Sequence, residues 1–215
     1  MDTFASKPGN INVNFARYFR LKWGWAIVGP VLAVVLALAG PVIWPGKSRV
    51  WYFVGALALA PVVAAYSTRT HFAKGCLLPG RVISNTPLLV ASITDLANGR
   101  DDKEYYCLAV QSVPAGIFDG QAPALGDECP VVAMFAPNSG KPFWSGFDPR
   151  PVKLASGDAT VFETACSRLD DEDLQQLDLA LQLTRPTKPG RWCVDVSEIG
   201  GGTSGWPNEK LGKPV

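Results

Sequence analysis

The side chains that could do nucleophilic, acid–base or metal chemistry are few and scattered along this chain. It has a single histidine, His71, and no two of its five cysteines form a C-x-x-C pair. A C-x-x-C pair would indicate zinc, thioredoxin-like or haem chemistry, and a histidine inside a soluble domain would be needed for a Ser-His-Asp or Cys-His arrangement. We therefore predict no catalytic, metal-binding or cofactor-binding residue. We expect each cysteine to be a small buried side chain in a reducing compartment; they are Cys76, Cys107, Cys129, Cys166 and Cys193.

Carboxylates offer the remaining chemistry, and their spacing does not select a pair. The acidic run 170–173 could suggest a metal site, but it lies at the start of a predicted helix, where acids favour the positive end of the dipole. There is no G-x-x-x-x-G-K-[ST] and no G-x-G-x-x-G motif to hold phosphates. We interpret the acids in loops or at strand ends as turn residues; they are Asp95, Asp119, Asp127, Glu128 and Asp148.

Two apolar segments dominate the N-terminal third of the chain. Residues 23–44 and residues 50–66 contain no charged residue, and only Pro-Gly-Lys-Ser-Arg separates them. A helix needs about 20 apolar residues to cross a bilayer. The sequence therefore predicts a two-helix transmembrane hairpin at 23–66. Two buried helices of a soluble protein are the weaker alternative, and a cleavable signal peptide is disfavoured because a second apolar segment follows at once.

Side chains within the hairpin predict how it sits in lipid. Small residues four positions apart let two helices approach closely. We expect the two strips to face each other, although alanine is also simply common in apolar helices; the strips are Gly29, Ala33 and Ala37, and Ala56, Ala60 and Ala64. Aromatic and basic residues favour the membrane interface. The predicted interface anchors are Trp23, Trp25, Trp44, Trp51, Arg17, Arg20, Lys22, Arg69 and Lys74.

Charge is divided unevenly along the chain. Residues 1–75 carry eight Lys and Arg against one acid, whereas residues 76–215 carry twelve against eighteen. Basic residues flank both outer ends of the hairpin, so the positive-inside rule places both termini and the soluble domain in the cytoplasm. The expected partners are anionic lipid headgroups and other membrane-protein subunits, and not nucleic acid, which would favour a basic domain.

The chain divides into five parts by composition. Residues 1–22 are a cytoplasmic or interfacial N-terminal segment, in which 10–22 form an interfacial helix or a disordered lead. The hairpin, 23–66, is followed by a basic juxtamembrane linker, 67–75, and a soluble domain, 76–199. Residues 200–215 are a Gly-rich tail that should be flexible unless a partner holds it.

The soluble domain is predicted to be α+β, with a small antiparallel β-sheet or open barrel and two C-terminal helices. Alternating apolar residues and turn signals predict the helices and strands. A helix at 158–167 precedes a second helix whose N-cap is Asp170, with Leu169 packed on Leu174 and an end at Pro186. The predicted strands are 80–84, 88–96, 105–113, 131–136 and 191–196, with weaker candidates at 142–147 and 151–155.

Several turn-rich motifs carry a family resemblance. They are Leu78-Pro79-Gly80-Arg81-Val82, Pro87-Leu88-Leu89-Val90-Ala91, Thr94-Asp95-Leu96, Gly126-Asp127-Glu128-Cys129-Pro130 and Pro189-Gly190-Arg191-Trp192. Over roughly residues 76–196 the chain resembles a bacterial family of membrane-anchored proteins known only as a domain of unknown function. The resemblance implies the α+β domain and assigns no activity or functional residue.

These features favour a non-catalytic accessory or scaffolding subunit of a bacterial inner-membrane complex, for which respiratory and photosynthetic assemblies are plausible hosts. The alternative is a membrane-tethered module that binds a peptide or small ligand through the loop 114–130. An enzyme that uses carboxylates or cysteine is the third possibility.

Overall fold

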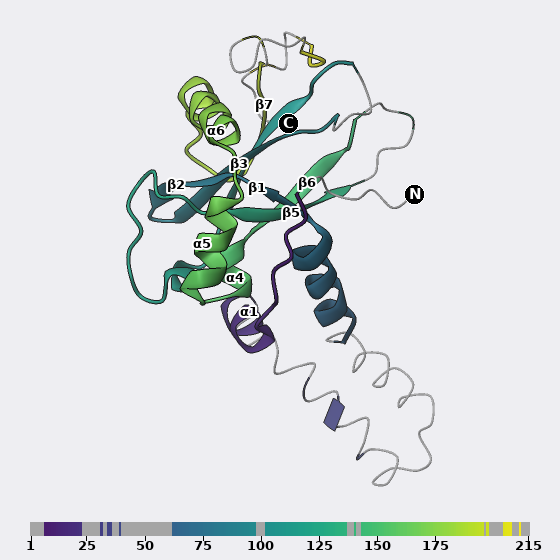
Figure 1. Ribbon diagram of the computed structural model, residues 1–215, viewed down its shortest axis with the longest axis vertical. Coiled ribbons are helices and arrows are strands. Elements are labelled where there is room, and N and C mark those ends of the chain that lie inside the picture. The colour runs from purple at the N-terminus through teal and green to yellow at the C-terminus, as the bar shows by residue number, and fades with distance from the viewer. Residues whose placement is uncertain are drawn as a thin grey trace.

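The fold combines antiparallel strands with short helices (Figure 1). This computed structural model describes residues 7–22, 31, 34–35, 39, 62–97, 102–136, 140, 143–195, 197, 204–207 and 211. The predicted α+β class is confirmed. The strands form two sheets, however, rather than the expected single sheet or open barrel.

The larger sheet has the order β2-β3-β4-β7, with all neighbours antiparallel. Its central strands were predicted from Leu-, Val- and Ile-rich runs, which suit strands that are buried on both faces. Alternate side chains of β3 enter two different cores, as the period of two requires. The strands are β2 (Gly80–Asn85), β3 (Leu88–Asp95), β4 (Tyr106–Ser112) and β7 (Gly190–Cys193).

The smaller sheet has the order β1-β5-β6 and consists of β1 (Cys76–Leu78), β5 (Val131–Ala136) and β6 (Gly146–Pro151). The chain passes from one sheet to the other at Pro79, between β1 and β2. Proline has no N–H to donate to a ladder, which suits it to this junction. β1 was not predicted because three residues are too short to show a pattern.

The two weak strand candidates do not match the structure. Of 142–147, only Gly146 and Phe147 lie in a described strand, β6. Residues 151–155 were a weak strand candidate, but β6 ends at Pro151 and α4 (Val152–Ala155) follows directly. Pro151 is the N-cap of α4, and Val152, Leu154 and Ala155 are buried. A helical turn therefore places these apolar side chains in the core where an extended chain would expose every second one.

The two C-terminal helices are confirmed. α5 (Ala159–Ser167) begins after Asp158, whose carboxylate accepts a hydrogen bond from the Thr160 N–H. α6 (Asp171–Thr184) packs Leu177 and Ala180 against the larger sheet. Asp170 holds the N-cap position of α6 as predicted, but its side chain makes no capping bond and instead forms an ion pair with Lys7.

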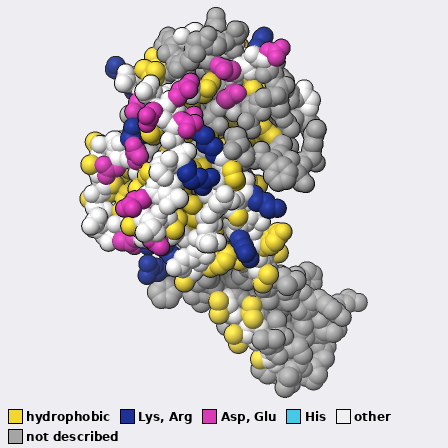
Figure 2. Space-filling model, in the orientation of Figure 1, with side chains coloured by type: hydrophobic (Ala, Val, Ile, Leu, Met, Phe, Trp, Pro, Cys, Tyr) yellow, Lys and Arg dark blue, Asp and Glu magenta, His cyan; other side chains and the backbone are white. Residues whose placement is uncertain are grey.

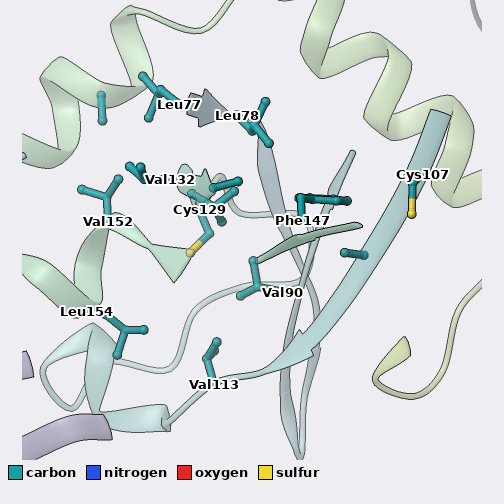
Figure 3. Close-up of a cluster of buried hydrophobic side chains, with 14 of the residues drawn as sticks. Leu77, Leu78, Val90, Cys107, Val113, Cys129, Val132, Phe147, Val152 and Leu154 are labelled. Atoms are coloured by element: carbon teal, nitrogen blue, oxygen red, sulfur yellow. The ribbon is translucent and has the colours of Figure 1, made fainter. Parts of the chain in front are cut away.

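The main core lies between the two sheets and extends beneath α4 and α5. Figure 3 shows Leu77 and Val132 of the smaller sheet facing the same interior as Val90 of the larger one. Cys129 is completely buried in this core, and Cys107 and Cys193 are 1% exposed. All five cysteines are thiols, three of them buried as expected and two, Cys76 and Cys166, half-buried.

The predicted transmembrane hairpin falls almost entirely outside the described residues. In the part of the chain that the structure describes, no helix is both long enough and apolar enough to span a bilayer. Residues 62–74 are helical, so most of the predicted linker 67–75 is the second half of a helix, here called the 62–74 helix. Its Thr68, His71 and Phe72 are buried. The sequence predicts these residues as a linker from their basic charge alone, which says nothing about their conformation.

The C-terminal tail packs on the domain at its described positions, although its sequence predicts flexibility. Trp206 is 8% exposed and packs edge-on against the Tyr105 ring and at a tilt against the Phe143 ring. Its indole Nε1 donates to the main-chain oxygen of Tyr106 at 2.8 Å. A single indole buries enough apolar area to hold a polar segment in place.

Candidate functional site

The surface with the clearest functional character is at one end of the molecule, where α1 (Phe15–Lys22) and the 62–74 helix lie (Figure 1). The first turns of the 62–74 helix expose apolar side chains: Val62 is 63%, Val63 is 65% and Tyr66 is 74% exposed. Val31 and Val35 of the predicted first span are also more than half exposed. Exposed large apolar side chains gathered at one end indicate a surface that meets lipid or protein.

Four cations of these two helices are exposed, and we call them the basic collar: Arg20 and Lys22 of α1, and Arg69 and Lys74 of the 62–74 helix. None of them forms an ion pair with any residue that the structure describes. Figure 2 shows the acidic side chains of the visible face mainly over the opposite part of the domain, around α5 and α6. Acids are therefore most frequent over α5 and α6, although Asp119 lies beside α1 and pairs with Arg17.

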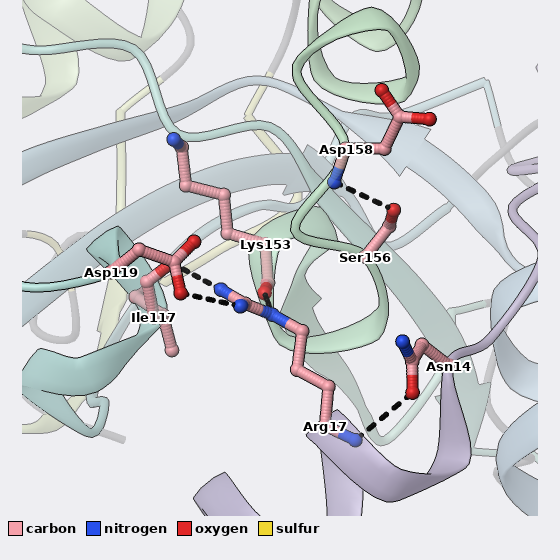
Figure 4. A network of polar contacts seen from close by, with 7 residues as sticks. All are labelled: Asn14, Arg17, Ile117, Asp119, Lys153, Ser156 and Asp158. Atoms are coloured by element: carbon pink, nitrogen blue, oxygen red, sulfur yellow. Dashed lines mark hydrogen bonds and ion pairs between the residues drawn. The ribbon is translucent and has the colours of Figure 1, made fainter.

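Arg17 was predicted as a membrane-interface anchor, but the structure places it inside the domain. It is 8% exposed, and its guanidinium donates to the main-chain oxygens of Ile117 at 2.7 Å and Lys153 at 3.0 Å (Figure 4). A third bond, of 2.6 Å, joins it to the carboxylate of Asp119. This contact lowers the pKa of the Asp119 carboxyl. Arg17 therefore fastens α1 to the domain, whereas Arg20, one turn later, is exposed.

The N-terminal segment before α1 is also bound to the domain. Main-chain bonds join Gly9 to Gly75 at 2.8 Å and Ile11 to Phe72 at 3.1 Å, so residues 7–11 run alongside the end of the 62–74 helix and the start of β1. Arg168 of the loop before α6 donates to the main-chain oxygens of Pro8 and Gly9. The segment thus contains a helix, α1, and this helix packs on the α+β domain.

His71 joins the 62–74 helix to the smaller sheet. Its Nε2 lies 2.8 Å from the main-chain oxygen of Val132, which can only accept, so Nε2 carries the proton. Burial, followed by the positive charge of Arg150, lowers the pKa of His71 to about 4. His71 is therefore neutral at physiological pH and does not contribute to the basic collar.

A cleft of about 200 Å³ lies between β1, the larger sheet and α6. Tyr106, Asp95, Lys7 and Asp173 line it. Lys7 forms an ion pair with Asp173 at 2.8 Å, and Asp95 accepts the N–H groups of Ala97 and Tyr105. Burial, with the charges of Glu104 and Asp95, raises the pKa of Tyr106 to about 12. Lys7, Asp173 and Asp95 are thus each bonded to another group of the protein.

The loop and strand-end acids also have structural partners. Each accepts from a backbone N–H or pairs with an arginine, so the structure brings no two of them together as an acid–base pair. Among the described residues there is no group of three or more His, Cys, Asp or Glu placed to hold a metal ion. The partners are Ala97 and Tyr105 for Asp95, Arg17 for Asp119, Ala124 for Asp127, Arg81 for Glu128 and Arg150 for Asp148.

The amino-acid sequence matches the family described as Protein of unknown function (DUF3239) over residues 64–184. The chain belongs to this family. The match begins inside the 62–74 helix and ends at the last residue of α6, so the family domain includes Arg69 and Lys74 of the basic collar but neither α1 nor β7. The family resemblance expected from the sequence is thereby confirmed.

Other comparisons add little to this assignment. A crystal structure described as that of "a putative membrane protein from Corynebacterium diphtheriae" is 22% identical and has a TM-score of 0.41, and the similarity covers 52% of this chain and 94% of that chain. No curated protein matches the chain.

Four of the predicted interface anchors, those of the basic collar, are exposed in the structure. The other predicted anchors, Trp23, Trp25, Trp44 and Trp51, lie outside the described residues, as do all the predicted packing residues except Ala64, which is half-buried. Sequence reasoning missed the inward role of Arg17, and no local signal distinguishes Arg17 from Arg20. The docking of Trp206 could have been suspected, because a lone tryptophan in a Gly-rich segment is unusual among tails.

Proposed function

We propose that this chain is a non-catalytic accessory or scaffolding subunit of a bacterial inner-membrane complex, of which respiratory and photosynthetic assemblies are candidate hosts. In this proposal residues 23–66 form a transmembrane helical hairpin. Both termini and the domain lie on the cytoplasmic side, where the domain contacts partner subunits.

The observation that carries the proposal is the change of surface along the 62–74 helix. Its first turns expose Val62, Val63 and Tyr66, whereas His71 and Phe72 near its end are buried in the domain. A soluble helix would not leave three large apolar side chains more than 60% exposed at one end without a partner for them. Lipid next to the apolar residues 50–61 is such a partner.

The basic collar supports the orientation. Lys and Arg near a cytoplasmic membrane surface each gain roughly 1 kcal/mol from anionic headgroups. Four exposed cations that form no ion pair with a described residue, on the two helices that flank the hairpin, suit a domain that rests this end on an anionic leaflet.

A scaffolding role suits the way the chain ends are held. Arg17 fixes α1 to the domain, and Trp206 fixes part of the tail. α1 and the region around Trp206 are therefore held on the surface of the domain. α1 ends at Lys22, directly before the first apolar segment of the sequence. Because α1 and the 62–74 helix both enter the hairpin from packed positions, partners bound to the domain would be held at a set distance from the bilayer.

A ligand-binding module based on the loop 114–130 remains the second proposal. Part of this loop is tied inward, through Ile117 and Asp119 to Arg17, and Val82 exchanges main-chain bonds with Gly126 and Asp127. The exposed Leu125, 66% accessible, is the feature that favours a partner at the loop tip. An enzyme is the third possibility; function retained after Asp95, Asp127 and Cys129 are each changed to Ala would remove it.

Topology is tested with a new cysteine on the far side of the domain. Cys107 and Cys193 are too buried to report on topology in the folded protein, so we choose Gln175→Cys on the exposed face of α6. An impermeant maleimide should label this variant only after the cells are opened, with the wild-type chain as the background control. Labelling of this variant in intact spheroplasts would overturn the cytoplasmic assignment.

The hairpin itself is tested by washing membranes with alkaline carbonate. Release of the chain from the membranes would overturn the hairpin.

Assembly is tested by purification in mild detergent. The full chain should co-migrate with stoichiometric membrane partners, and isolation as a lone monomer would contradict the subunit proposal. Ala33→Leu and Ala60→Leu should disrupt the hairpin contact and the assembly. Ala39→Leu and Ala58→Leu lie off the small-residue strips and are the matched controls; equal behaviour of the two sets would show that the strips do not face each other.

A further inference from the structure

Two cysteines far apart in the sequence lie directly opposite each other in the larger sheet. Cys107 of β4 is the register partner of Cys193 of β7. The neighbouring pair, Tyr106 and Val194, is joined by a main-chain bond of 3.0 Å. Hydrogen-bonded and non-hydrogen-bonded pairs alternate along an antiparallel ladder, so Cys107 and Cys193 form a non-hydrogen-bonded pair.

This register suits a covalent bond between the two sulfurs. The Cα atoms of such a pair are typically about 4.5 Å apart, and disulfides typically span about 4.4–6.8 Å. Side chains directly opposite each other point to the same face of a sheet. Both cysteines indeed belong to the same buried core cluster, which also contains Trp206.

We propose that Cys107 and Cys193 are a modification site, at which a low-molecular-weight disulfide oxidises the two thiols to an intramolecular disulfide that fastens β7 to β4.

The chemistry is two successive thiol–disulfide exchanges. The thiolate of Cys193 attacks one sulfur of the small disulfide, forms a mixed disulfide and releases one small thiolate. The thiolate of Cys107 then attacks the Cys193 sulfur and releases the second small thiolate. The protein loses two electrons and two protons, and the oxidant is reduced to two thiols.

Described residues of the tail lie beside this pair. Leu211 bridges to Cys193 along the outer edge of β7, and Trp206 donates to the same Tyr106 oxygen that accepts from Val194. Both cysteines are 1% exposed, and burial, with the neighbouring Cys193, raises the pKa of the Cys107 thiol to about 12. The thiolate forms, and the oxidant enters, when the tail moves away. Oxidation should therefore be slow in the intact protein and faster once the tail is loosened.

The test uses the full chain in mild detergent, treated with oxidised glutathione and then unfolded, alkylated and digested without reductant. We expect loss of two of the five thiols, a peptide pair linked through Cys107 and Cys193, and a higher thermal midpoint. Cys129→Ser, at another buried cysteine, should still form the link, and Cys107→Ser should not. Trp206→Ala should accelerate the link several-fold.

Three outcomes would overturn the proposal. One is the presence of all five thiols after treatment of both the wild-type chain and Trp206→Ala. Another is a separate glutathione adduct on each cysteine with no link between them. The last is a linked peptide pair of equal yield in the Cys107→Ser variant, which would show that other cysteines react.

Discussion

The guanidinium of Arg17 donates to the main-chain oxygen of Ile117, 100 residues later in the chain, at 2.7 Å. Arg17 is 8% exposed, and its charge is stable in the domain because each of the three guanidinium nitrogens donates to an acceptor (Figure 4). The contact places α1, and with it the entry to the first apolar segment, against the loop before Asp119.

Replacement of Arg17 by Ala should lower the free energy of unfolding by roughly 3 kcal/mol, because it leaves two buried carbonyl groups without a donor. Limited proteolysis should then cut α1 earlier than in the wild-type chain. Arg20→Ala, on an exposed position of the same helix, is the matched control and should change stability by less than about 0.5 kcal/mol. Similar losses for the two variants would show that the Arg17 network does not hold α1.

The stability of the domain should depend on pH through its only histidine. The folded pKa of His71 is about 4, below the ordinary value of 6.5, so the folded state favours the neutral ring. Below pH 6.5 the unfolded chain takes up a proton that the folded chain does not. Stability should therefore fall between pH 6.5 and pH 4, by up to roughly 3 kcal/mol.

His71→Gln isolates this effect, because glutamine can still donate to the Val132 oxygen but does not titrate. Unfolding of the full chain in detergent, followed at several pH values, should show a smaller loss for His71→Gln than for the wild-type chain between pH 6.5 and 4. Parallel stability profiles for the two proteins would exclude His71 as the cause.

The tail should be released by one added methyl group. A Cβ placed on Gly205 would overlap the Tyr105 ring, so Gly205→Ala forces either the ring or the tail to move. We expect faster proteolysis of the tail in Gly205→Ala and in Trp206→Ala, with a loss of roughly 3 kcal/mol for the latter. Pro207→Ala, at an exposed position, is the control. Unchanged digestion rates in both variants would mean that the indole does not fix the tail.

Arg81 joins the edge strand β2 to α6 through two parallel bonds to the Asp178 carboxylate, each 3.0 Å long. Asp178→Asn should cost roughly 1–2 kcal/mol, because Asp178 is partly exposed and solvent screens the pair. Arg81→Lys should cost a similar amount, since lysine cannot form the two-fold contact. Asp171→Asn, exposed at the start of α6, is the comparison. The measurement is denaturant unfolding, and equal midpoints would show that the pair adds no stability.

Local patterns in the sequence determined most of the secondary structure. The apolar runs of β3, β4 and β5 and the acids at the start of α6 were sufficient, because strand and helix formation depend on neighbours a few residues away. Composition alone also predicted that charge would be divided between the two parts of the chain. The sequence did not predict α4 or β1, because elements of three or four residues are too short to repeat a pattern.

Tertiary structure alone decided the contacts between distant residues. It separated the strands into two sheets at Pro79, turned Arg17 inward while Arg20 stayed outside, bound Trp206 to Tyr106 and placed Cys107 opposite Cys193. Each of these depends on which distant segments share a core. That choice is made by burial and hydrogen bonding summed over the whole domain, and no spacing within one segment encodes it.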